Sequence, residues 1–319
     1  TPAEKIEGKI VFINQHMNEK HIQTFKAYGG CYPVRGNGAS EGAKKGAIAV
    51  IIRSLGLAID DHPHTGSMSY EDGVKQIPAA AISTSDAERI ENLIDKNPQT
   101  KYEFILEMDC KKLEDKISYN VIGEIPGNSK QDEIITIGGH LDSWDTGEGA
   151  HDDGAGIIHC LEAFRILRSM NYIPKHTLRV VFFMNEENGN MGGKTYAQWV
   201  KEKKEKHIAA LESDRGGFAP RGFTCDGSEA NLEWLKSQAQ LFEDYDLHVF
   251  DKGYGGVDIG PLKKEYPEIA LFGFVPDSQR YFDMHHSPND VFENVNKREL
   301  ELGAAAVASF LYLIDQQFK

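Results

Sequence analysis

The chain has 319 residues, of which 40% are hydrophobic, and its formal net charge is −14. This length and hydrophobic content favour a soluble, globular protein of about two domains, each with its own core. The negative charge argues against nucleic-acid partners and anionic membrane surfaces, because both repel an acidic protein. The most apolar segment, residues 303–314, is shorter than the roughly 20 residues that a membrane-spanning helix requires.

The first hundred residues alternate short strand-like runs with polar connections. We predict three strands and one helix in this part, over residues 9–14, 47–53, 77–82 and 85–95 respectively. This pattern predicts a small α/β or β-rich module.

Two segments of this module invite other interpretations. The Gly-rich segment 36–42 misses the spacing of a dinucleotide-binding motif, so we interpret it as a loop. The polar cluster at residues 60–64 includes His62 and His64 and could bind a metal ion. Because Pro63 interrupts it, we interpret it as a structured loop.

After Asn97-Pro98 the pattern changes to strands that alternate with helices. We predict strands over residues 102–108, 119–125, 134–137, 178–184 and 208–211, and helices over residues 157–170, 194–204 and 297–315. Such alternation forms βαβ units, so it predicts a doubly wound α/β fold with a mainly parallel sheet and helices on both faces. We therefore expect two domains, residues 1–98 and residues 99–319.

The four cysteines are widely separated and form no Cys-x-x-Cys pair, so they predict neither a thiolate zinc site nor a disulfide framework. The chain begins at Thr1 without a methionine or an apolar signal region. We therefore expect a processed or excised product.

Acidic residues and histidines follow the strands of the second domain, where ligands gather in open α/β sheets. His140 ends a strand, and Asp142 follows two residues later, so a carboxylate could orient a metal-binding imidazole. On its own, such a His-x-Asp pair more often makes only a hydrogen bond.

Asp152 and Asp153 stand immediately before a helix. An N-cap explains one of them, whereas a second carboxylate could also bridge two cations.

Glu186 and Glu187 follow the next apolar strand. Such a pair is usually a charged turn, but successive residues of an extended segment point in opposite directions, so one could bind a metal and the other could face water. Asp214 follows a further strand, and His285 and His286 lie in a late loop. Together these imidazoles and carboxylates provide a complete ligand set for two zinc ions.

The motifs HLDSWD at residues 140–145 and GAHDDG at residues 149–154 resemble those of the co-catalytic di-zinc exopeptidases that include bacterial leucyl aminopeptidase. The resemblance is closest to the branch that contains plasma glutamate carboxypeptidase, and it covers essentially the whole chain. Residues 1–98 resemble the protease-associated domain of this branch. In that branch a further N-terminal segment of the catalytic domain precedes the inserted domain, so the resemblance implies a fragment that lacks this segment.

The resemblance implies a zinc exopeptidase fold with two zinc ions per chain. His140 and Asp214 would hold one ion, Glu187 and His286 would hold the other, and Asp152 would bridge them. The protease-associated domain carries no complete ligand set, so we expect it to shape access to the site rather than to do chemistry.

The implied activity is hydrolysis of dipeptides or short peptides with a free terminus by a hydroxide bound to both zinc ions. Glu186 would be the general base, and Asp142 would orient His140. We expect Tyr254, Asp258 and Tyr281 to contribute to the peptide-binding pocket. The sequence leaves open whether the enzyme is an aminopeptidase or a carboxypeptidase.

Two other functions are compatible with the fold. One is a glutaminyl-cyclase-like acyltransferase with a single zinc ion, and the other is a receptor-type relative that has lost its ligands. The complete ligand set argues against the second. The resemblance alone implies a secreted or extracytoplasmic protein, lysosomal or periplasmic locations included, and it leaves a homodimer open.

Overall fold

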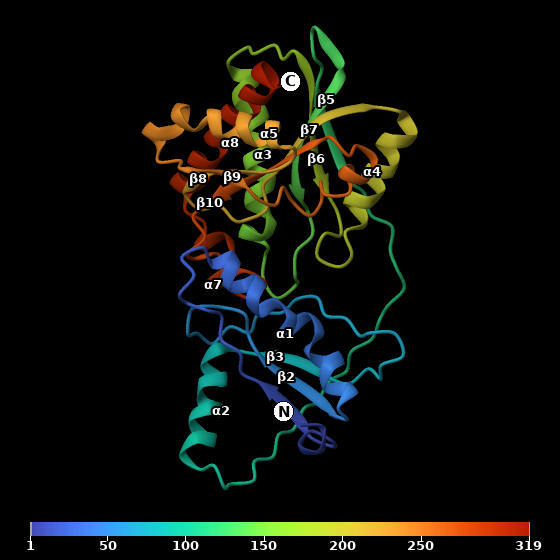
Figure 1. Ribbon diagram of the computed structural model, residues 1–319, viewed down its shortest axis with the longest axis vertical. Helices are drawn as coiled ribbons and strands as arrows, with labels where there is room; N and C mark the ends of the chain where they lie inside the picture. Colours follow the sequence, from blue (N-terminus) through green and yellow to red (C-terminus); the bar gives the residue numbers. More distant parts are fainter. Residues whose placement is uncertain (1, 319) are drawn as a thin grey trace. The chain divides into compact units, whose positions relative to one another are not determined.

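The computed structural model describes residues 2–318, which form two compact units (Figure 1). The first unit comprises Thr1–Ile117 and the segment Phe282–Asn289, and the second comprises Ser118–Tyr281 and Asp290–Lys319. The first unit thus runs past residue 98 and includes a late segment that the sequence pattern did not indicate.

The first unit contains a parallel three-stranded sheet in the order β1 (Ile10–Ile13), β2 (Ala49–Arg53) and β3 (Ala79–Ile82). Helices α1 (Thr24–Lys44) and α2 (Thr84–Lys96) complete it. The three predicted strands and the predicted helix are confirmed. The helices have 21 and 13 residues, whereas the strands have 4, 5 and 4, so the unit is more helical than β-rich.

The loop predicted over residues 36–42 is wrong, because this segment belongs to α1. A Cβ atom at Gly42 would lie 2.7 Å from Cγ2 of Val50, and one at Gly38 would lie 3.1 Å from Cδ1 of Ile13. The glycines therefore let the helix approach β1 and β2 closely. This packing outweighs the low helix propensity of glycine.

The strand predicted over residues 102–108 is also wrong, since residues 101–120 form neither helix nor strand. Apolar side chains of this segment remain exposed, and Ile105 is 84% exposed. The apolar pattern was not enough to form a strand, because no neighbouring strand pairs with the segment. The prediction that residues 60–64 form a loop is confirmed.

The second unit is built on a seven-stranded sheet in the order β4-β6-β5-β7-β10-β8-β9. Its strands are β4 (Val121–Ile125), β5 (Lys130–His140), β6 (His176–Phe183), β7 (Lys206–Glu212), β8 (Pro220–Asp226), β9 (Val249–Lys252) and β10 (Ala270–Pro276). The β4–β6 and β10–β8 pairs are antiparallel, and the other four pairs are parallel. The predicted mainly parallel α/β sheet is confirmed as a mixed, mostly parallel one.

Helices cover both faces of this sheet (Figure 1). They are α3 (Ala155–Ser169), α4 (Met191–Lys203), α5 (Glu229–Ser237), α6 (Leu262–Glu265) and α8 (Lys297–Gln317). The short helix α7 (Tyr281–Met284) begins at the last residue of this segment of the second unit and continues into the first. One apolar core packs under α3, α5 and α8, and a second packs under α4 and α6. Leu211 of β7 contributes to the first core and Ala210 to the second, because successive strand residues face opposite sides. Among the described residues, no helix is both long and apolar enough to cross a membrane.

Candidate metal centre

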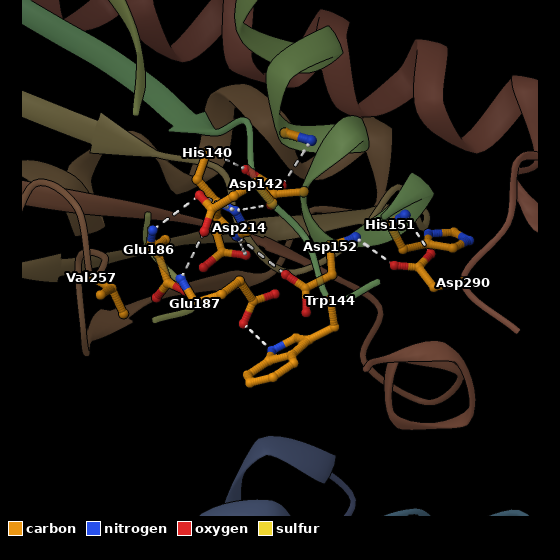
Figure 2. Close-up of polar contacts among 12 residues, drawn as sticks. His140, Asp142, Trp144, His151, Asp152, Glu186, Glu187, Asp214, Val257 and Asp290 are labelled. Atoms are coloured by element: carbon orange, nitrogen blue, oxygen red, sulfur yellow. Dashed lines mark hydrogen bonds and ion pairs between the residues drawn. The ribbon is translucent and has the colours of Figure 1, made fainter. Parts of the chain in front are cut away.

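Three adjacent parallel strands, β6, β5 and β7, end at the same edge of the sheet. His140 is the last residue of β5, Glu186 follows the end of β6, and Asp214 follows the end of β7. Their side chains therefore converge at this edge, as Figure 2 shows. This is the place where open α/β sheets bind ligands.

His140 lies at the centre of this convergence. Its Nε2 atom is 3.3 Å from Oδ1 of Asp152 and 3.5 Å from Oδ1 of Asp214. The ligand atoms of His140, Glu186 and Glu187 lie within 4.8 Å of one another, which is close enough for them to hold one metal ion together.

Asp153 gives a second group of this kind. Its ligand atom lies within 4.8 Å of those of His140 and Asp214. The Asp153 carboxylate also accepts the backbone N–H of His140 and of Gly156, both at 3.0 Å. It therefore fixes the end of β5 against the start of α3.

Two of these atoms fit a metal ion particularly well. Nε2 of His140 and Oδ1 of Asp214 are buried, and neither has a hydrogen-bond partner among the residues that the structure describes. They face each other at ion-pair distance without forming a hydrogen bond, whereas buried polar atoms nearly always form one. Imidazole nitrogen and carboxylate oxygen are ordinary zinc ligands, so the residues present fit zinc.

The pKa values of the clustered side chains also favour a bound cation. Burial and the negative charge of Asp214 raise the pKa of Glu186 to about 9, and they also raise the pKa of Asp153 well above its usual range. Burial opposes protonation of His140, yet the neighbouring Asp152 and Asp214 hold the pKa of its imidazole well above the ordinary value. The ionised carboxylates of the cluster are therefore disfavoured without a cation, and a bound cation would stabilise them.

Asp142 contacts both His140 and the Glu186–Glu187 pair. Its main-chain carbonyl accepts the Nδ1–H of His140 at 2.7 Å, whereas its carboxylate oxygen lies 3.8 Å from Nδ1. The carboxylate instead accepts the backbone N–H of Glu186 at 3.0 Å and that of Glu187 at 3.2 Å. The closer contact of Asp142 with His140 is thus made by the carbonyl, and the role of Asp142 in orienting His140 stays a prediction. A proton fixed on Nδ1 leaves the lone pair of the neutral ring on Nε2.

Sequence reasoning assigned no role to two other residues that hold this site. The indole Nε1 of Trp144 donates to Oε2 of Glu187 at 2.5 Å. The Asp290 carboxylate accepts the backbone N–H of His151 at 2.6 Å and that of Asp152 at 3.0 Å. Both residues lie in or beside the motifs that contain the histidines. Their polar character was a signal, but their partners depend on the folded chain.

His286, the remaining predicted zinc ligand, lies in the segment Phe282–Asn289 of the first unit. Its Nδ1 atom lies 3.1 Å from the carbonyl oxygen of Thr65, and the N–H of Thr65 donates to the carbonyl of His286 at 2.9 Å. A carbonyl can only accept, so Nδ1 carries the proton, and metal binding by His286 would use Nε2. His286 stays a predicted ligand.

The three predicted pocket residues differ in burial. Tyr254 is 55% exposed, whereas Asp258 and Tyr281 are buried. Neither carboxylate oxygen of Asp258 has a hydrogen-bond partner among the described residues. Burial and the nearby Glu212 raise the pKa of Asp258 to about 10. Contact of Tyr254, Asp258 and Tyr281 with substrate remains a prediction.

The mostly parallel sheet, with imidazole and carboxylate groups at its carboxyl edge, defines the zinc exopeptidase fold. Residues 120–311 match the sequence model of Peptidase family M28. The chain belongs to this family.

Similar proteins agree with this assignment. The chain is 33% identical over 316 residues to carboxypeptidase Q of Mus musculus, and 32% identical over 313 residues to that of Homo sapiens. Each alignment covers 98% of this chain and 64% of the relative, so the chain spans less than two thirds of their length.

Solved structures show the same fold. A Peptidase M28 precursor from Shewanella amazonensis has a TM-score of 0.89 and 34% identity, over 99% of this chain and 70% of that one. BSAP, a zinc aminopeptidase from Bacillus subtilis, has a TM-score of 0.62 and 21% identity, over 99% of this chain and 72% of that one. The second likeness concerns the fold alone.

Proposed function

We propose that the chain is a zinc-dependent exopeptidase that hydrolyses dipeptides or short peptides with a free terminus. Membership of Peptidase family M28 and the likeness to carboxypeptidase Q support this proposal. The observation that carries it is the pair of buried atoms without hydrogen-bond partners, Nε2 of His140 and Oδ1 of Asp214, within a cluster of carboxylates. The extracytoplasmic location and the homodimer stay predictions from the resemblance.

The proposed ligand set for two zinc ions combines imidazoles and carboxylates. It consists of His140, Asp152, Glu187, Asp214 and His286. When bound, zinc supplies a Lewis acid that lowers the pKa of a coordinated water and polarises the scissile carbonyl. Asp142 and Trp144 support this set, because they hold His140, Glu187 and the backbone between β6 and α4 in place.

Glu186 is the proposed general base. Its carboxyl is largely buried, and its pKa of about 9 arises first from burial and then from the charge of Asp214. A cation held by Asp214 would offset that charge and bring the pKa of Glu186 closer to neutral. The carboxylate could then take a proton from the attacking water and give it to the leaving amine.

The proposal can be tested with zinc-loaded protein and matched sets of free, N-blocked and C-blocked dipeptides. We expect hydrolysis of free dipeptides, its loss when a chelator removes zinc, and its return when zinc is added. The blocked peptides then decide between amino- and carboxypeptidase activity. No hydrolysis by protein that holds two zinc ions would contradict the proposal, and cyclisation of an N-terminal glutamine with one zinc ion would indicate the acyltransferase instead.

A further inference from the structure

A second buried carboxylate, that of Glu212, lies at the end of β7, two residues before Asp214. We propose that Glu212 is a positioning residue that fixes the loop of residues 254–260, here called the 254–260 loop, for peptide binding beside the metal centre. The inference rests on the proposed function, because it assigns the loop to substrate binding.

Glu212 uses both carboxylate oxygens on this loop. Oε1 accepts the backbone N–H of Val257 at 2.7 Å, and Oε2 accepts that of Ile259 at 2.9 Å. The two amides flank Asp258, so one carboxylate fixes the backbone on both sides of a predicted pocket residue. Glu212 is only 2% exposed, and hydrogen bonds that are shielded from water are stronger than exposed ones.

The loop approaches Glu212 too closely for any side chain between them. A Cβ atom at Gly256 would lie 2.1 Å from Cδ of Glu212 and 2.3 Å from its Oε1 atom. Gly256 therefore allows the backbone to reach the carboxylate. This close, buried contact between Glu212 and residues 256–259 is here called the junction, and it differs from an incidental hydrogen bond at the surface.

Other side chains attach the same loop to the segments that carry the site. Arg215, next to Asp214, donates to the carbonyl of Tyr254 at 3.0 Å. Asn190, which follows the Glu186–Glu187 pair, donates to the carbonyl of Val257 at 2.7 Å. The loop is thus linked to the segment after β7 and to the start of α4. Arg215 and Asn190 bind carbonyl groups of the loop, whereas Glu212 binds the amides on both sides of Asp258.

The loop presents groups that a peptide could engage. Asp258 is buried, and its carboxylate oxygens have no hydrogen-bond partner among the described residues, while Tyr254 is 55% exposed. Asp258 has no exposed surface, so Tyr254 is the one of these two residues that a peptide can contact, while the buried Asp258 belongs to the backbone that Glu212 holds. Because the loop contains no proposed zinc ligand or base, a change in its position should alter substrate binding more than the chemical step.

Glu212→Gln tests this role. The substitution replaces one acceptor oxygen by an amide NH2 that must face a backbone N–H. We expect KM for a hydrolysed dipeptide to rise about tenfold or more, the effect of leaving a buried backbone N–H without an acceptor. We expect kcat to change less than KM and zinc content to stay at the wild-type level. Hydrogen exchange should show faster exchange at Val257 and Ile259.

Asp315→Asn is the matched control. Asp315 is fully buried and also accepts two backbone N–H groups, those of Lys175 at 2.9 Å and His176 at 2.8 Å. His176 begins β6, so this carboxylate lies at the sheet edge opposite the metal centre. The control should lower the melting temperature and leave KM unchanged.

An unchanged KM in Glu212→Gln, with Val257 and Ile259 still protected, would overturn the proposal. Loss of zinc or of kcat at constant KM would overturn it as well, because it would assign Glu212 to the metal centre. If Glu212→Gln does not fold, Gly256→Ala perturbs the same junction from the loop side and should raise KM in the same way. If the wild-type protein hydrolyses no peptide, the proposed function fails, while rapid exchange at Val257 and Ile259 in the wild type would separately refute the junction.

Discussion

Nε2 of His140 lies 3.5 Å from Oδ1 of Asp214, and neither atom has a hydrogen-bond partner among the residues that the structure describes. Two ligand atoms that face each other in this way, amid carboxylates with raised pKa values, would be stabilised by a cation.

We therefore predict that the folded chain binds two zinc ions and that zinc raises its melting temperature. Each zinc ion that binds only to the folded state stabilises it by about 2.7 kcal/mol at a free zinc concentration of 100 times Kd. Calorimetric titration and thermal unfolding with and without zinc measure both effects. Asp214→Asn should weaken the binding. A chain that binds no zinc and melts at the same temperature in both conditions would contradict the prediction.

Glu186 and Glu187 are neighbours, but we predict different consequences of their substitution. Glu186→Gln should retain zinc and lower kcat by roughly 10²–10⁴-fold, because a general base is lost. Glu187→Gln should lower zinc affinity, because Glu187 is a proposed ligand whose carboxylate is oriented by Trp144. Zinc titration and steady-state kinetics on both variants check this division. Normal turnover in both would show that the assigned roles are wrong.

Asp142→Asn separates two ways in which this residue could act. Its carbonyl holds His140, whereas its carboxylate holds the amides of Glu186 and Glu187. The substitution changes only the carboxylate, so we expect kcat to fall by about 10–100-fold, the usual effect of removing a supporting contact. Zinc affinity should fall less than in Glu187→Gln. A larger loss of zinc affinity than in that variant would mean that the carboxylate orients the ligands.

The sequence predicted those parts of the fold that depend on local pattern. Strands β5, β6 and β7 and helices α3, α4 and α8 follow hydrophobic periodicity, and they were found close to their predicted residues. Polar residues at strand ends indicated a metal site, whereas the assignment of each zinc ligand rested on the resemblance to the di-zinc exopeptidases. His140, Glu186, Glu187 and Asp214 do converge there, because three adjacent parallel strands end at one edge.

The parts that could not be predicted depend on contacts between distant segments. The Gly-rich part of α1 is helical because β1 and β2 pack against its glycines. Asp290 and Glu212 accept backbone N–H groups that are distant in the sequence. The nearest partner of Asp290 is 138 residues away and that of Glu212 is 45 residues away, and no spacing rule identifies such pairs. The same holds for the segment Phe282–Asn289, which joins the first unit although it follows β10.

The final prediction concerns His207, which lies on β7 and has a fully buried side chain. Burial lowers the pKa of His207 from 6.5 to about 4, although Glu205 acts in the opposite direction. In the unfolded chain the imidazole has its ordinary pKa near 6.5. Below that pH the unfolded state binds a proton that the folded state excludes. The stability contributed by neutral His207 is therefore complete above pH 6.5 and is lost as the pH falls towards 4.

His207→Gln removes this titration and keeps a hydrogen-bonding side chain next to Thr136 and Glu205. Urea unfolding of zinc-free protein between pH 7.5 and 5 compares it with the wild type. The difference between the two proteins is the relevant quantity, because raised pKa values, such as those of Glu186 and Glu212, change stability in the opposite direction. Relative to the variant, the wild type should lose up to about 2 kcal/mol of unfolding free energy by pH 5. A difference that stays constant over this range would mean that His207 is protonated as readily in the folded state as in the unfolded one.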